Sequence, residues 1–189
     1  RQKIIIMKSI INQLTIIALF LFVSCDSKPS LQKYFVENSE NKDFVSLDIS
    51  PSILKMDEKK MSVAQKEAFQ SFEKMNVLAF KVNDKNKAQF EAERAKVNSI
   101  LKDEKYQQLM KFGSGKEGAS VSFVGTDDNI EEFILYGNQK DKGFAVVRVL
   151  GNKMNPTSIM EMISILKDSN FDMEQLKPLQ ALWTKDTIK

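Results

Sequence analysis

The sequence predicts one two-layer α+β domain over residues 43–183, with a mainly antiparallel sheet, helices on one face and the order β-α-β-α-β-β-β-α. The chain has 189 residues, which suits one domain and is short for two. Apolar residues alternate or run continuously in some segments and recur at helical spacing in others, so both kinds of element are expected. The last three expected strands follow one another through short links, which permit only antiparallel neighbours.

The first half of this domain alternates strands with helices. Residues 44–50 place Val45, Leu47 and Ile49 on one side and polar side chains on the other, which is typical of a half-buried strand that Pro51 ends. The apolar residues of the following segment recur at helical spacing and predict an amphipathic helix over about 61–75. They are Met61, Ala64, Ala68, Phe72 and Met75.

A second strand and a long helix come next. Residues 77–82 are too continuously apolar for a fully exposed strand, and Asn83 and Asp84 offer N-caps for a helix over about 84–104. We expect a further helical piece from the spacing of Tyr106, Leu109 and Met110. It ends before the glycine-rich segment 113–118, which is then a flexible connection from a helix to a strand.

The second half contains three strands in close succession, over 119–124, 132–136 and 144–150. Glycines at both ends of 137–143 indicate a hairpin between the last two. The strand 144–150 is the most continuous apolar run and is expected to be central. A final helix follows Asn155-Pro156, with Ile159, Met162, Ile163 and Leu166 on one face. Asp172 and Gln175 then form a capping signature ahead of a small C-terminal helix, and 184–189 form a tail.

The N-terminal segment has the pattern of a secretion signal. Residues 1–24 are a signal peptide in this interpretation, with basic residues first and an apolar stretch from Ile10 to Val23, and Met7 is the expected start. All of the +3 net charge lies there, because the remaining chain holds 25 basic and 25 acidic residues. The body therefore has no basic surplus for nucleic acid.

Cys25, the only cysteine, follows the apolar stretch and the small residue Ser24. This placement resembles a bacterial lipobox, although Phe22 stands where that signal usually has leucine. The resemblance implies that Cys25 is lipidated and becomes the first mature residue, with 25–42 as a tether. Several acyl chains anchor a protein stably where one does not. An ordinary signal peptide or a lone membrane helix remains the alternative.

Composition excludes several kinds of catalysis. The chain has no histidine, which removes Ser-His-Asp and Cys-His catalysis and histidine-ligated zinc. One cysteine allows no intrachain disulfide and no cysteine-rich metal site. We expect no cofactor and no metal.

Five further features have a structural and a functional interpretation. Segment 113–118 lacks the P-loop spacing and position. The acidic residues Asp127, Asp128, Glu131 and Glu132 lie between strands and favour a solvated turn over a Ca²⁺ site or a carboxylate pair. Arg148 interrupts an apolar strand and is expected to face solvent or to pair with a carboxylate such as Asp48, rather than an anionic ligand.

The remaining two features concern methionines and the C-terminal tail. Met154, Met160, Met162 and Met173 favour core packing over a soft metal site. Thr187, within Asp186-Thr187-Ile188, resembles a Bacteroidota O-glycosylation site.

Several stretches resemble a family of Bacteroidota lipoproteins known as domain of unknown function 4252, over about 43–167. They are the segment from Val45 to Ser52, the strand 77–82, the segment from Asp103 to Met110 and the segment from Phe144 to Asn152. The resemblance implies an envelope location and a non-enzymatic role, and it transfers no catalytic residue.

The sequence thus favours a membrane-anchored envelope lipoprotein, on the periplasmic or outer-membrane face, that acts as a non-catalytic interaction or regulatory module. Its partner is an unknown envelope protein or a second copy of itself. A hydrolase based on carboxylates such as Asp127 and Asp128 and a carrier of a small apolar ligand remain the alternatives.

Overall fold

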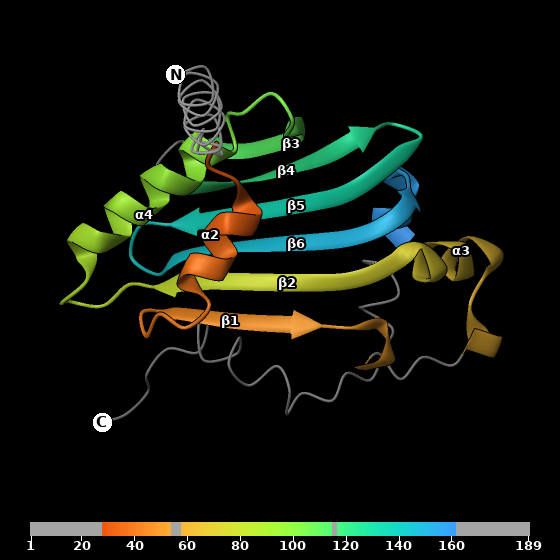
Figure 1. Cartoon of the computed structure of the whole chain (residues 1–189), viewed down its shortest axis with the longest axis horizontal. Coiled ribbons are helices and arrows are strands. Elements are labelled where there is room, and N and C mark those ends of the chain that lie inside the picture. The colour runs from red at the N-terminus through yellow and green to blue at the C-terminus, as the bar shows by residue number, and fades with distance from the viewer. Residues whose placement is uncertain (1–27, 54–57, 115–116, 162–189) are drawn as a thin grey trace, which may run out of the picture.

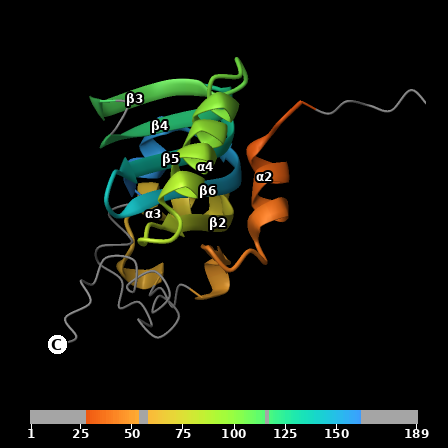
Figure 2. The ribbon, with the colours of Figure 1, turned by 90° about the vertical axis from the view of Figure 1, so that its left-hand side faces the viewer.

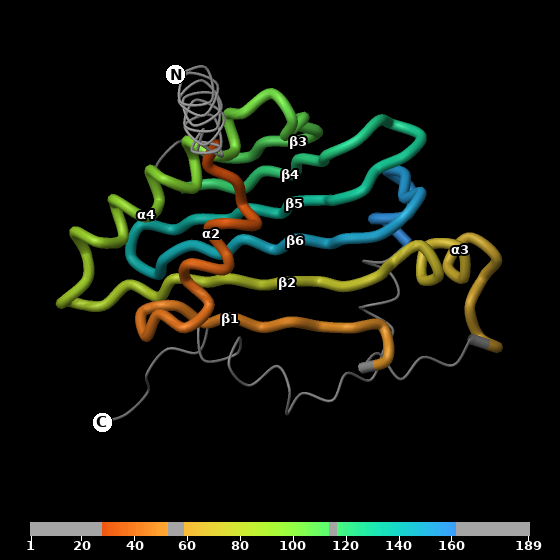
Figure 3. The backbone as a smooth tube through the Cα atoms, in the orientation of Figure 1, coloured from red at the N-terminus to blue at the C-terminus, as the bar shows by residue number. Residues whose placement is uncertain are grey.

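Six strands form one antiparallel sheet in the order β1-β2-β6-β5-β4-β3 (Figure 1). The computed structural model describes residues 28–53, 58–114 and 117–161. The strands are β1 (Phe44–Ile49), β2 (Phe72–Lys81), β3 (Gln107–Ser114), β4 (Glu117–Thr126), β5 (Asn129–Gln139) and β6 (Gly143–Met154). The β4–β5 and β5–β6 turns lie at opposite ends of the sheet (Figure 3).

The helices are α2 (Leu31–Asn38), α3 (Val63–Ser71) and α4 (Lys87–Ile100), with short 3₁₀ turns η1 (Pro51–Ile53) and η2 (Glu58–Lys60). A further helix begins after Asn155 and includes the described residues 156–161. Strands and helices therefore form the predicted single α+β domain, and the predicted order is confirmed. The structure adds helix α2 before the first strand and strand β3 before the last three.

One face of the sheet, here the first face, is covered by α2 and α4 (Figure 2). Its core is an aromatic cluster in which Phe80 stacks on Phe144 at 5.7 Å between ring centroids and meets Phe44 edge-on at 5.1 Å. Phe90 of α4 packs on both Phe80 and Phe144. Aromatic rings bury large apolar areas, so this cluster fixes the two helices on the sheet.

The opposite or second face has its own core at one end. Phe72, Phe133 and Val149 pack there with Ala68 of α3 and Ile159 of the last helix. A capping box fixes the start of α3, because the Ser62 side chain accepts from the Gln65 N–H and Gln65 Oε1 accepts from the Ser62 N–H. Among the described elements, α3 and the last helix are the helices of this second core. The described helices therefore lie on both faces of the sheet, rather than on one face as the sequence predicts.

The β5–β6 hairpin requires glycine at its end. Gly143 has φ +126°, and a Cβ there would lie 1.8 Å from the carbonyl oxygen of Phe80. Only glycine adopts this conformation readily and leaves room for β2. The predicted hairpin over 137–143 is confirmed, with Lys140 to Lys142 between the two strands.

Two predicted helical segments are strands in part. The helix expected over 61–75 ends at Ser71, and Phe72 and Met75 belong to β2. The helical piece expected through Tyr106, Leu109 and Met110 is wrong, because 107–114 form β3. The register shifts between Phe72 and Lys74 and between Gln108 and Met110. Each irregularity breaks the strand alternation and produces a spacing of three or four that imitates a helix.

The glycine-rich segment 113–118 is also different from the prediction. It links β3 to β4 and therefore joins two strands rather than a helix and a strand. Gly113 has φ +77° and pairs with Gly118 across the hairpin. Since a P-loop requires a following helix, the structure agrees with its exclusion.

Helix α2 lies within the stretch that the sequence assigns to a tether. Leu31, Tyr34 and Phe35 are buried against the first face, and the Leu31 N–H donates to the Tyr106 hydroxyl at 3.0 Å. The packed unit therefore begins by Leu31 rather than at residue 43. Residues 1–27 and 162–189 lie outside the described residues, and with them the predictions for Cys25, Met162, Met173 and Thr187. Among the described helices, none has the length and apolar character needed to cross a membrane.

Candidate interaction surface

The acidic cluster divides between solvent and an ion pair. Asp127 and Asp128 form the exposed two-residue turn between Thr126 of β4 and Asn129 of β5, as the solvated-turn interpretation predicts. Glu131 is exposed as well, whereas Glu132 is largely buried. The described residues contain no group of three potential metal ligands.

Arg148 points to the first face and pairs with Glu132 rather than with Asp48. Its Nε and Nη2 donate to the two carboxylate oxygens of Glu132 at 2.6 and 3.1 Å. The two side chains are 8% and 13% exposed, and the guanidinium lies 5.3 Å from the ring centre of Phe35 in α2. Glu132 and Phe35 are thus the partners of this guanidinium within the fold. Asp48 instead accepts a hydrogen bond from Asn76, which lies on the strand between β1 and β6.

Two tyrosines form hydrogen bonds with side chains of α4. Burial raises the pKa of Tyr34, and the hydrogen bond that its hydroxyl donates to Glu93 of α4 at 2.8 Å raises it further. Burial also raises the pKa of Tyr136, against the lowering effect of its hydrogen bond with Asn98. Both phenols are held protonated at neutral pH, so neither is poised as a general base.

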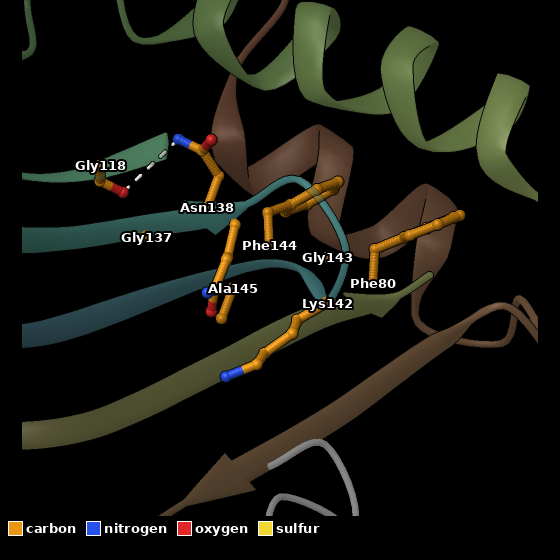
Figure 4. Close-up of a pocket in the computed structure, with 9 residues that line it drawn as sticks. Phe80, Gly118, Gly137, Asn138, Lys142, Gly143, Phe144 and Ala145 are labelled. Carbon is orange, nitrogen blue, oxygen red and sulfur yellow. Dashed lines mark hydrogen bonds between the residues drawn. The ribbon is translucent and has the colours of Figure 1, made fainter. Parts of the chain in front are cut away.

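A hollow of about 240 Å³ lies at the β5–β6 hairpin end of the sheet (Figure 4). Gly137, Asn138, Lys142 and Ala145 are among its lining residues, and Lys142 is its one charged side chain. The buried Oδ1 of Asn138 has no hydrogen-bond partner in the described part of the chain. A hollow without a carboxylate offers no acid–base pair for hydrolysis.

Apolar side chains cross the second face in registered rows. One row consists of a residue from each strand, each opposite the next: Leu47, Val77, Val147, Leu135, Val121 and Met110. The adjacent row runs parallel to it through the smaller residues Val45, Ala79, Ala145, Gly137 and Ala119, and it ends at the larger Phe112. Both rows end on β3, at the edge of the sheet.

Strand β3 is where the described surface is most apolar. Leu109, Met110 and Phe112 are 39%, 45% and 59% exposed. The other large apolar side chains exposed in the described residues, Val36, Val63 and Met160, lie singly on three different helices. No described strand pairs with the outer side of β3, so its backbone N–H and C=O groups on that side are available to an added strand.

The sequence interpretation missed this surface. It placed Leu109 and Met110 on a helix and made no use of Phe112. The signal that identifies the strand is the alternation of Met110 and Phe112 with Lys111, directly before glycines that close a hairpin. Two of the methionines that the sequence assigns to core packing differ in burial. Met154 is buried in the second-face core, whereas Met160 is 63% exposed.

Comparison with known proteins identifies the family. The family model described as Domain of unknown function (DUF4252) matches residues 34–162. The chain belongs to this family. The match begins within α2 and extends past the last described residue of the sheet, and thus includes all six described strands of the DUF4252 domain. The family description names no enzymatic activity. No curated protein and no solved structure matches the chain.

Proposed function

We propose that this DUF4252 protein is an envelope lipoprotein, anchored through Cys25, that acts as a non-catalytic interaction module. The observation that carries the interaction role is the edge strand β3, which combines free backbone groups with three exposed apolar side chains. Such an edge is the usual site of strand addition by a partner. Natural sheets protect their edges unless the edge has a use.

The anchoring role is supported by the sequence of the N-terminal segment. An apolar stretch ends at Ser24-Cys25, and a polar stretch leads from there to α2. Since α2 packs on the first face, a lipid at Cys25 leaves the outer edge of β3 free to meet a partner. The hydrolase alternative has less support, because Asp127 and Asp128 lie exposed in a turn.

The experiment has two arms. Cys25→Ser in the full chain should abolish incorporation of a labelled fatty acid and release the protein from the detergent-extracted membrane fraction. A photo-crosslinking residue at position 112 should give adducts in intact cells, whereas the same residue at Val63, which is 74% exposed, should not.

The two arms fail separately. A Cys25→Ser protein that stays in the membrane and is processed normally contradicts the anchor. Equal adducts at positions 112 and 63, or none at either, contradict β3 as the interaction surface.

A further inference from the structure

We propose that the partner of β3 is a second copy of this chain, which pairs with it in antiparallel fashion around a two-fold axis at Lys111. This proposal rests on the proposed function and names the partner at the same surface. The two β3 strands then join two six-stranded sheets into one continuous sheet. The interface is isologous, because the same strand serves on both sides.

The pattern of side chains on β3 suits such self-pairing. Residues directly opposite each other in an antiparallel pair lie on the same face. With Lys111 on the axis, Met110 of each copy lies opposite Phe112 of the other, which gives two apolar pairs on the second face. Placing Phe112 on the axis gives one apolar pair and sets Met110 against Ser114. The first arrangement therefore covers more of the exposed apolar side chains.

The rows of the second face continue across this interface. Met110 ends the row that contains Val121, and Phe112 ends the row that contains Ala119. In the proposed register the Val121 row of one copy meets Phe112 of the other, and the Ala119 row meets Met110. Each larger side chain at the edge thus extends a row of its neighbour, and the apolar rows continue from one sheet into the other.

The geometry is compatible with two anchored molecules. A two-fold axis perpendicular to the sheet keeps the first faces of both copies on the same side. Because α2 lies on the first face, the chains that lead back to both copies of Cys25 start from the same side and can reach one membrane. The body of the chain also holds equal numbers of basic and acidic residues, so long-range repulsion between copies is small.

The available area indicates a weak contact that the membrane strengthens. Aromatic side chains bury about 150–250 Å² when fully covered, and Leu and Met are somewhat smaller. The exposed parts of Leu109, Met110 and Phe112 therefore amount to roughly 250 Å² per copy. Two copies supply about 500 Å² from side chains, below the roughly 1,200 Å² of a stable complex. Confinement to one membrane raises the effective concentration and favours pairing.

Lys111 gives this proposal its most specific consequence. It lies on the first face opposite Ser120, and the two-fold axis places it opposite Lys111 of the second copy. Directly opposed like charges weaken strand pairing modestly. Lys111→Gln should therefore strengthen self-association about two- to fivefold, and Phe112→Lys should weaken it at least tenfold.

The test is disulfide formation in the full chain in its native membrane. The proposed function has the Cys25 thiol acylated there, so Cys25 does not form disulfides. Lys111→Cys should give a product of twice the chain mass on mild oxidation, since opposed Cα atoms about 4.5–5.5 Å apart suit a disulfide. Val63→Cys and the unaltered chain serve as controls and should give none. Co-expressed Met110→Cys and Phe112→Cys chains should also crosslink, more than either alone.

The outcomes separate this proposal from the proposed function. A Lys111→Cys product of another mass overturns self-pairing and leaves β3 as the surface for a different envelope protein. If the Phe112→Cys chain crosslinks with a second copy of itself and the Lys111→Cys chain does not, the proposed register is wrong. Lack of a dimer product overturns self-pairing, while photo-crosslinking at position 112 and fractionation of Cys25→Ser still decide the proposed function.

Discussion

Removing Arg148 should destabilise the domain severely, because it leaves the Glu132 carboxylate buried without its partner. The pair is bidentate, at 2.6 and 3.1 Å, and its side chains are 8% and 13% exposed. Breaking a buried pair by removing one member costs about 3–5 kcal/mol. A domain of this size has a total stability of about 5–15 kcal/mol, so Arg148→Met removes a large part of it.

The measurement is urea unfolding of the wild type, Arg148→Met and the double variant Arg148→Met/Glu132→Leu. The single variant should lose about 3–5 kcal/mol and roughly 6–20 °C in melting temperature. The double variant should recover most of this loss, because two apolar side chains in place of a buried pair are often neutral. Lys33→Met is the control, since Lys33 and Glu37 form an exposed pair at 4.0 Å that is worth at most about 1 kcal/mol.

Two results would refute this reasoning. One is an Arg148→Met protein within about 1 kcal/mol of the wild type, which would mean that water reaches Glu132 in the folded state. The other is a double variant as unstable as the single one, which would assign the loss to packing of the Arg148 stem under Phe35 rather than to the stranded charge.

Three further predictions test the two faces, the acidic turn and the buried phenol. Val146 is fully buried and Val147 is half-buried on the opposite face, so Val146→Asp should cost several kcal/mol and clearly more than Val147→Asp in urea unfolding; equal losses would contradict the two-face assignment. Asp127→Asn/Asp128→Asn should fold and function as the wild type does, and hydrolytic turnover that disappears in this variant would establish the enzyme instead. The raised pKa of Tyr34 means that the unfolded chain releases this proton first, so stability should fall as the pH rises above about 10. Urea titrations from pH 9 to 11 should show a shallower fall for Tyr34→Phe, and identical slopes would speak against the raised pKa.

The strands that the sequence predicts well are those whose two faces differ in a regular way. Alternation identifies β1 from Val45, Leu47 and Ile49, and the structure places Ile49 in the second-face core. The continuous run of β6 has a different cause, because Val146 faces the aromatic cluster and Val149 faces the second-face core. A strand covered on both faces has no polar side to alternate with.

In helix α4, the residues that favour helix formation and the residues that are buried are largely different. The predicted helix over 84–104 is observed from Lys87 to Ile100, but the residue that anchors it is Phe90, together with Val97 and Ile100. The alanines at 88, 92 and 95 are exposed and support the helix through propensity alone. Sequence spacing recognises the helix without locating its buried face.

The partner of Arg148 depends on long-range register, which no local pattern contains. Arg148 is opposite Asn76 on one side and Ile134 on the other. Glu132 reaches it diagonally from β5, and Phe35 closes over it from α2. A cross-strand carboxylate can be predicted from the composition of a strand, but its identity follows only once the strand order is known.

Strand β3 combines features that oppose edge pairing with features that favour it. A register shift at Leu109 and the charge of Lys111 are common devices against edge-to-edge association, whereas the exposed Met110 and Phe112 promote it. Their coexistence suits an association that is weak, reversible and responsive to charge. It also suits an association that stops at two copies, since an isologous contact uses the same edge of both sheets and leaves no second β3 to continue. The far edge, β1, presents exposed Ser46 and Asp48 on its first face, and a partner there would have to be more polar than the one that fits β3.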